Sequence, residues 1–163
     1  MRQIITLIFV FTSISSFCQI TDNTIRLQVL ESGITDSLFV FGKWTSDGQT
    51  QTELRYLGKI TTDSGKVYKI LNSSWIWGLS RRATIRILIY TDNNDYVGNY
   101  HLNTISDLPE RIENGQLVFT NKSKEGCDKT ITTNIDLRKG CPKEIFIKCT
   151  ETEGGIFIFT LDQ

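Results

Sequence analysis

Hydrophobic and polar residues alternate along most of this 163-residue chain. In Arg82–Tyr90, the apolar residues Ala83, Ile85, Ile87 and Ile89 stand at every second position. A period of two is typical of a strand that buries one face and exposes the other. Similar patterning predicts about ten strands, at Thr24–Leu30, Ser37–Trp44, Thr52–Ile60, Lys66–Leu71, Arg82–Tyr90, Tyr96–Leu102, Gln116–Thr120, Thr130–Leu137, Lys143–Thr150 and Ile156–Leu161.

The segments between these strands carry turn residues such as Asn114-Gly115, which tolerate the positive φ of tight turns. We expect a helical turn only within Ser106–Glu113, where Pro109 limits its length. Closely spaced strands without intervening helices predict an all-β fold, an antiparallel β-sandwich of about ten strands. A closed meander β-barrel is the alternative. Because Ile156–Leu161 is apolar on both faces, we expect it inside a sheet and not at an edge.

One short motif bears on the barrel alternative. Gly42-Lys43-Trp44 resembles the Gly-x-Trp signature of lipocalins, which are secreted eight-stranded ligand-binding barrels. The resemblance covers three residues, and the motif ends the second expected strand here, whereas in lipocalins it lies on the first barrel strand. The other lipocalin motifs are not recognisable, so the sandwich remains the favoured architecture.

The first 18 residues have the parts of a secretory signal peptide. Arg2 supplies a positive tip, Ile4–Ile14 is a short apolar run, and Ser16 and Cys18 are small residues before Gln19. We therefore expect cleavage after Cys18 and a single β domain at residues 19–163, secreted or periplasmic. Lipidation of Cys18 is a weaker alternative because bulky Phe17 precedes it, and a membrane anchor is weaker because the run is short of about 20 residues.

Composition argues against several classes of function. The chain carries 18 Lys and Arg against 18 Asp and Glu, so no basic excess suggests a nucleic-acid partner. No second long apolar segment predicts a transmembrane span after the signal is removed. The only histidine, His101, is not linked to a nucleophile motif, and the cysteine spacings lack a zinc knuckle. We expect no catalytic residue, no metal site and no cofactor, although a hydrolase with paired carboxylates stays open because its two acids need no sequence adjacency.

Three tryptophans form the most distinctive side-chain pattern. Trp75 and Trp77 are two residues apart, so both point the same way in an extended segment, and Trp44 is the third. Indoles that are exposed and coplanar would form a stacking platform for sugar rings, whereas buried indoles would be core. Because Trp75–Leu79 contains no polar residue, we expect core packing, with ligand binding by these tryptophans as the alternative.

Three cysteines follow the predicted signal peptide. We expect Thr130–Leu137 and Lys143–Thr150 to form a hairpin, with Cys141 at its turn and Cys149 at its far end. Cys127 precedes the first of these strands and therefore lies at the same far end. A disulfide requires Cα atoms within about 7 Å, so the sequence predicts a Cys127–Cys149 bridge and an exposed free thiol at Cys141.

These observations favour an exported, non-enzymatic binding protein. Its partner is expected to be another protein, as for a periplasmic inhibitor, immunity protein or surface-complex component, or a glycan. The second possibility, a carbohydrate-binding module, rests on the tryptophans, and exposure of Trp75 and Trp77 is the observation that separates the two.

Overall fold

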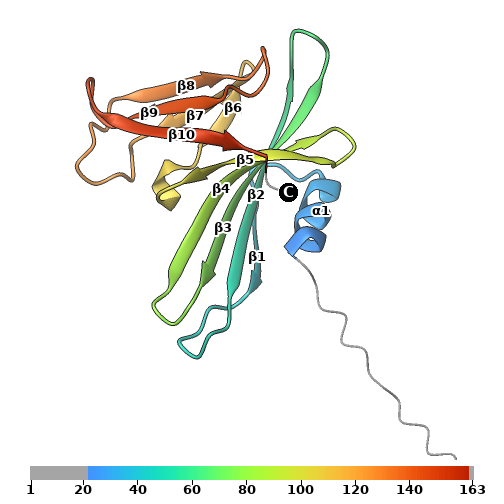
Figure 1. The fold of residues 1–163 in the computed structure, drawn as a ribbon, viewed down its shortest axis with the longest axis vertical. Helices are drawn as coiled ribbons and strands as arrows, with labels where there is room; N and C mark the ends of the chain where they lie inside the picture. The colour runs from blue at the N-terminus through green and yellow to red at the C-terminus, as the bar shows by residue number, and fades with distance from the viewer. Residues whose placement is uncertain (1–21, 162–163) are drawn as a thin grey trace, which may run out of the picture.

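Two antiparallel sheets pack face to face, and one helix lies on the outer side of the larger sheet (Figure 1). The computed structural model describes residues 22–161, so the predicted signal peptide lies outside the described residues. The elements are α1 (Asp22–Ser32), β1 (Leu38–Gly42), β2 (Gln51–Thr61), β3 (Val67–Trp77), β4 (Arg82–Thr91), β5 (Tyr96–Leu102), the 3₁₀ turn η1 (Ile105–Asp107), β6 (Arg111–Glu113), β7 (Gln116–Thr120), β8 (Thr132–Asp136), β9 (Glu144–Lys148) and β10 (Gly154–Thr160). The predicted all-β sandwich is confirmed, and the sheets do not close into a barrel.

The larger sheet has seven strands in the order β1-β2-β3-β4-β5-β10-β9, and the smaller has three in the order β6-β7-β8. Consecutive hairpins build β1 to β5, whereas β10 returns from the end of the chain to pair with β5. In the strand order β10 lies between β5 and β9, as expected for the last strand, but it pairs with β9 at Gly154–Ile158 and with β5 only at Phe159 and Thr160, so most of its length is paired on one side alone. Its outward side chains Ile156 and Ile158 are exposed.

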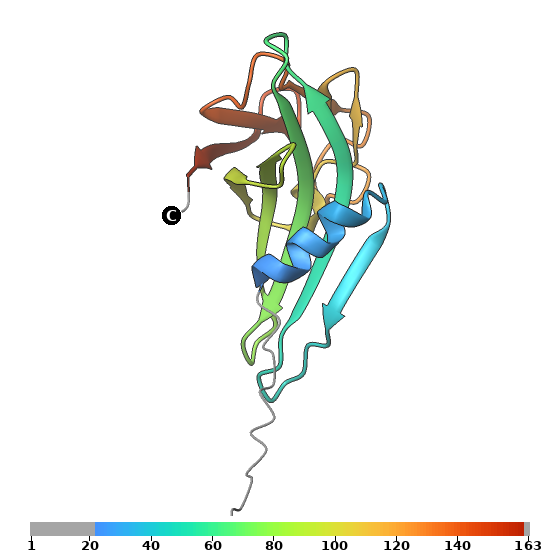
Figure 2. The same ribbon diagram turned by 90° about the vertical axis from the view of Figure 1, so that its right-hand side faces the viewer.

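The main core lies between the two sheets. It is built from the inward residues of both, including Ile70, Ile87, Leu117 and Phe157. A second, smaller core lies on the opposite face of the larger sheet, where α1 packs (Figure 2). The smaller sheet therefore covers part of one face of the larger sheet, and α1 covers part of the other face.

The prediction of a strand at Thr24–Leu30 is wrong, because this segment belongs to α1. Ile25 and Val29 are four positions apart, so they satisfy a helical period as well as an alternating one, and both are buried together with Leu30. The adjacent pair Val29-Leu30 breaks the alternation, and Gly33 follows the helix with a φ of 64°, as at many helix ends. No helix within residues 22–161 is long and apolar enough to cross a membrane.

The prediction of a hairpin between the strands at Thr130–Leu137 and Lys143–Thr150 is also wrong. β8 pairs with β7, and β9 pairs with β10, so the two strands belong to different sheets. The connection between them is held elsewhere: the Asp63 amide donates to the Arg138 carbonyl at 2.8 Å, and the Tyr100 hydroxyl donates to the Pro142 carbonyl at 2.7 Å. These bonds direct the chain from the smaller sheet to the larger one.

Gly42, part of the Gly-x-Trp motif, has a local structural role. Its φ is 72°, and a Cβ atom at this position would lie 2.5 Å from the Thr50 carbonyl oxygen. Only glycine fits this close approach of the two chain segments without strain. Since the segment before β1 is helical, the motif ends the first strand of the fold.

Candidate functional site

A groove lies beside α1 on the helix-covered face of the larger sheet. Its floor is a row of cross-strand neighbours: Phe41 of β1, Thr52 of β2, Trp75 of β3 and Thr84 of β4. The groove has a volume of about 520 Å³, which lies within the range of small-ligand sites. We call it the Trp75 groove and define it by Arg26, Phe41, Thr52, Trp75, Thr84 and Arg86.

Trp75 and Trp77 form a stacked pair on this face. Both lie on β3 two residues apart, so their side chains emerge from the same side of the sheet. Their ring centroids are 5.5 Å apart, and their planes meet at 23°. Trp75 is 40% exposed and lines the groove, which leaves an indole surface accessible to a ligand.

The other two indoles are held by the protein. The Trp77 indole N–H donates to the Thr84 hydroxyl at 3.0 Å, and the Trp44 indole N–H donates to the Gly78 carbonyl at 2.9 Å. Trp44 thereby ties the loop after β1 to the turn after β3, and it does not line the groove. The structure therefore brings Trp75 and Trp77 together as a pair and gives Trp44 a supporting position at the same end of the sheet.

The expectation that Trp75 and Trp77 pack inside the core is wrong. Trp75 is exposed and Trp77 is half-buried. The apolar residue between them, Ile76, is the one that is buried, at 5% exposure. The buried cluster under α1 does not include the tryptophans, although the first turn of α1 lines the groove beside Trp75. An unbroken apolar run in the sequence does not reveal this difference.

The charges in the Trp75 groove come from α1 and β4. Arg26 and Asp22 form an ion pair one helical turn apart. Arg86 of β4 takes part in none of the ion pairs formed within residues 22–161. Its Nε atom is buried and has no hydrogen-bond partner among these residues. The groove thus combines an aromatic surface with a guanidinium group that the described chain does not neutralise.

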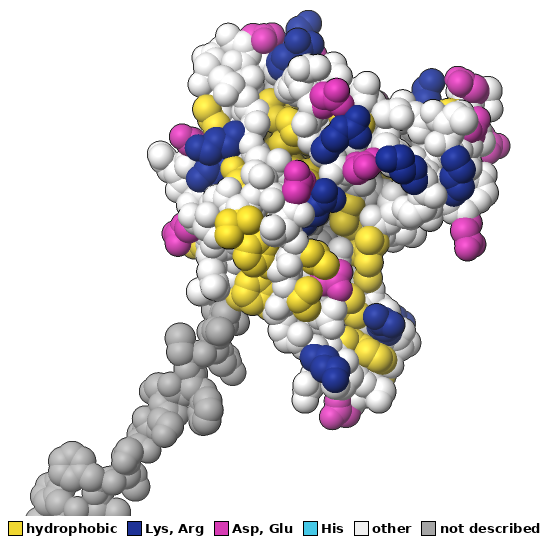
Figure 3. Space-filling model, turned by 180° about the vertical axis from the view of Figure 1, so that it is seen from behind, with side chains coloured by type: hydrophobic (Ala, Val, Ile, Leu, Met, Phe, Trp, Pro, Cys, Tyr) yellow, Lys and Arg dark blue, Asp and Glu magenta, His cyan; other side chains and the backbone are white. Residues whose placement is uncertain are grey.

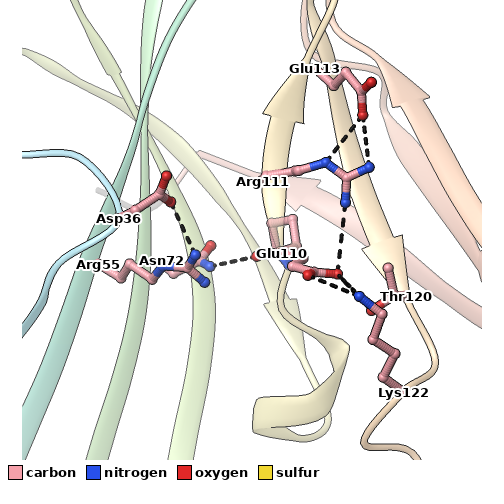
Figure 4. Close-up of polar contacts among 9 residues, drawn as sticks. Asp36, Arg55, Asn72, Glu110, Arg111, Glu113, Thr120 and Lys122 are labelled. Carbon is pink, nitrogen blue, oxygen red and sulfur yellow. Dashed lines mark hydrogen bonds and ion pairs between the residues drawn. The ribbon is translucent and has the colours of Figure 1, made fainter.

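A second concave region lies on the opposite face of the larger sheet, facing η1, the segment before β6 and the end of β7 (Figure 4). We call it the Asn72 cleft; its volume is about 580 Å³. Asn72 is 4% exposed, and its amide nitrogen donates to the Pro109 carbonyl at 2.9 Å. Ion pairs stand on both sides, Arg55 with Asp36 at 3.0 Å and Lys122 with Glu110 at 3.2 Å. Each charged group of these pairs therefore has its partner within the protein.

The Asn72 cleft bears on the paired-carboxylate alternative. Hydrogen bonds from the Thr120 hydroxyl and from Lys122 lower the pKa of the Glu110 carboxyl below its usual value. A general acid in a glycosidase needs the opposite shift, because it must hold a proton at working pH. The geometry around Glu110 thus favours a structural ion pair. Among residues 22–161, no group of three or more His, Cys, Asp or Glu side chains is placed to hold a metal ion.

The structure contains the Cys127–Cys149 disulfide that the sequence predicts, with the two Cα atoms 4.6 Å apart. The pairing is right although the hairpin behind it is wrong, because the loop after β7 places Cys127 beside the end of β9. There, the Asp128 amide donates to the Cys149 carbonyl at 2.8 Å. Cys141 is a free thiol, but the prediction that it is exposed is wrong: it is half-buried against the main core, and burial raises its pKa to about 11.

Sequence reasoning missed the two arginines of the Trp75 groove. Arg26 was hidden because its segment was interpreted as a strand. Arg86 stands on the polar face of β4 together with Thr84, and this face is recognisable from the alternation. Its position beside Trp75, however, depends on the register between β3 and β4, which pairs Trp75 with Thr84.

Comparisons with protein-family models, with curated proteins and with solved structures found no match. The Trp75 groove is therefore the feature of the molecule from which a function can be inferred.

Proposed function

We propose that this protein is an exported, non-enzymatic glycan-binding protein whose site is the Trp75 groove. The observation that carries the proposal is the exposed side chain of Trp75 at the floor of a groove. The two indoles are stacked on each other and do not form the coplanar platform considered from the sequence, so Trp75 alone offers the binding surface and Trp77 supports it. A flat indole surface buries the apolar face of a sugar ring, while nearby hydroxyl and charged groups bind its polar edge. Thr52, Thr84 and Arg86 supply such groups within the groove.

Export is part of the proposal and is supported by two features. Residues 1–18 have the pattern of a signal peptide, and the Cys127–Cys149 disulfide is of the kind that persists in oxidising compartments. The mature protein should begin at or near Gln19. Intact mass spectrometry of the exported protein tests this point, because a mass that includes Met1–Cys18, or a lipid on Cys18, contradicts it.

Affinity electrophoresis through gels that contain soluble polysaccharides tests the binding proposal. The protein should be retarded by at least one polysaccharide of a panel that includes neutral and acidic chains, and Trp75→Ala should abolish the retardation. Leu79→Ala is the matched control, because Leu79 is an apolar residue that is 72% exposed in the neighbouring turn but lies outside the groove. Equal retardation of the protein and the Trp75→Ala variant on every gel contradicts the proposal.

Binding of another protein is the second candidate function, favoured by the surface along β1. This strand forms one edge of the larger sheet, and its side chains Leu38 and Val40 are 62% and 52% exposed. Figure 3, which views the molecule from behind, shows exposed hydrophobic side chains over its lower half. Within residues 22–161 no strand pairs with the outer side of β1. Such an edge with apolar side chains fits an extended segment of a partner, which would add a further strand.

A charge on the edge strand tests this second candidate. A photo-crosslinker placed at position 40 should capture a partner in envelope preparations, and Leu38→Lys should prevent the capture. Position 158 is the control, because Ile158 is also exposed but pairs with Glu144 of β9 and stands directly before the two residues of β10 that pair with β5. Equal capture from positions 40 and 158, or capture that survives Leu38→Lys, contradicts strand addition.

A further inference from the structure

We propose that the Trp75 groove selects acidic glycans, and that Arg86 binds a carboxylate carried by the sugar ring that stacks on Trp75. This inference rests on the proposed glycan-binding function and names its ligand class. It is carried by the juxtaposition of an accessible indole and an unpaired guanidinium within one groove.

The charges that line the groove do not balance. Three ionised side chains line it: Asp22, Arg26 and Arg86. Asp22 and Arg26 pair with each other, which leaves the positive charge of Arg86 without an acidic partner in the described chain. A neutral glycan would leave this guanidinium unneutralised, whereas a carboxylate would accept two parallel N–H bonds from it.

Arg86 is partly shielded from solvent by its surroundings. It lies on β4, inside the larger sheet, with Ser73 of β3 and His101 of β5 as its cross-strand neighbours. Its side chain is half-buried, and its Nε atom is shielded from solvent without a hydrogen bond to residues 22–161. A carboxylate would contact the accessible part of this half-buried guanidinium and not the shielded Nε atom, and pairing a partly desolvated cation recovers part of its desolvation cost.

Arg86 lies within reach of a sugar ring that stacks on the Trp75 indole. Trp75 is the direct cross-strand neighbour of Thr84, and Arg86 is two residues further along β4 on the same face. Such diagonal neighbours lie about 7–8 Å apart, which matches the span of one sugar ring with its carboxylate. One uronic acid residue can therefore stack on Trp75 and reach the Arg86 guanidinium at the same time.

Paired polysaccharides that differ only in their carboxylates provide the test. Polygalacturonate, alginate and hyaluronan would each be compared with their methyl-esterified forms by isothermal titration calorimetry. We expect at least one free acid to bind about tenfold or more tightly than its ester, and this preference to weaken at high salt. Arg86→Gln should remove the preference, and Arg86→Lys should retain part of it because a positive charge remains.

Arg55→Gln is the matched control variant. It removes the same charge from the opposite face of the sheet, so it reports any general electrostatic effect of net charge. An equal loss of preference in Arg55→Gln and Arg86→Gln, or equal affinities for acid and ester, overturns the assignment of Arg86 while leaving glycan binding in place. If esterified or neutral chains bind in a way that depends on Trp75, glycan binding at the groove is shown independently of Arg86. Absence of binding to every polysaccharide overturns the proposed function itself.

Discussion

Removal of the Cys127–Cys149 disulfide should lower the free energy of unfolding by about 3.4 kcal/mol. The two cysteines are separated by 22 positions, so the bridge closes a loop of 23 residues when both ends are counted. In the chain-entropy relation, a loop of this length restricts the denatured ensemble by about 11 cal/mol/K, which gives the stated value near 25 °C. The perturbation is the double variant Cys127→Ala, Cys149→Ala.

The native fold should survive this substitution, because other bonds hold the same junction. The Asn121 side-chain amide donates to the Cys149 carbonyl at 3.1 Å, and the Cys149 amide donates to the Glu153 carbonyl at 2.8 Å. The loss of stability should therefore arise mainly in the denatured state. We also expect the denaturant m value to rise, because an uncrosslinked chain exposes more surface on unfolding.

Urea unfolding followed by tryptophan fluorescence measures both quantities. The unfolding free energy of the reduced protein should match that of the double variant. A Cys141→Ala variant should keep the full sensitivity to reductant, because Cys141 is a free thiol that takes no part in the bridge. Two results would refute the claim that the bridge stabilises the fold by closing this loop. One is a loss of unfolding free energy below about 1 kcal/mol in the double variant. The other is an equal effect of reductant on the stability of the double variant and of the parent protein.

Two further predictions concern ionisable groups. Burial raises the pKa of the Cys141 thiol from 9.0 to about 11, so iodoacetamide at pH 8 should modify it slowly in the native protein and rapidly in urea. The folded-state pKa of Cys141 is higher than the unfolded one, so the contribution of the buried neutral thiol to stability is complete below pH 9 and is lost as the pH rises toward 11. Cys141→Ala should reduce this loss of stability at high pH. Bonds from Arg138 lower the pKa of Asp136 from 3.8 to about 2, so its contribution is lost as the pH falls from 4 toward 2. Asp136→Asn should flatten that acid limb in urea unfolding, and an unchanged limb would contradict the role of the Arg138 bonds.

Alternation located most strands because the turns around them are marked by glycine and asparagine. The predicted bounds of Tyr96–Leu102 and Gln116–Thr120 are those of β5 and β7. β3 extends to Trp77. The prediction ended this strand at Leu71 because the next residues, Asn72 to Ser74, are polar on both faces and so do not alternate. Asn72 can be buried there since its amide binds the Pro109 carbonyl, a contact that local pattern does not reveal.

The helix was missed for a physical reason that is visible in its sequence. Ile25, Leu27 and Val29 alternate as in a strand, but Ile25, Val29 and Leu30 form the buried stripe of a helix. Short segments allow both interpretations, and tertiary packing on the sheet decides between them. The consequence for the site was large, because α1 supplies Arg26 to the Trp75 groove.

The candidate site itself was only partly accessible from the sequence. Spacing placed Trp75 and Trp77 on the same face, as the structure confirms. Their exposure depends on where α1 packs on the sheet, and the position of Arg86 depends on strand register, so neither could be derived from local pattern. These are long-range properties of the packed molecule.

The most direct test of the account follows the indole N–H signals of the three tryptophans by two-dimensional NMR during titration with a polysaccharide that the protein binds. The account predicts that the Trp75 signal shifts or broadens most, with a smaller change for Trp77, on which it stacks. The Trp44 signal should stay in place, because its N–H is bonded to the Gly78 carbonyl outside the groove. A bound polysaccharide that leaves Trp75 unchanged, or that perturbs only Trp44, would contradict the assignment of the Trp75 groove as the binding site.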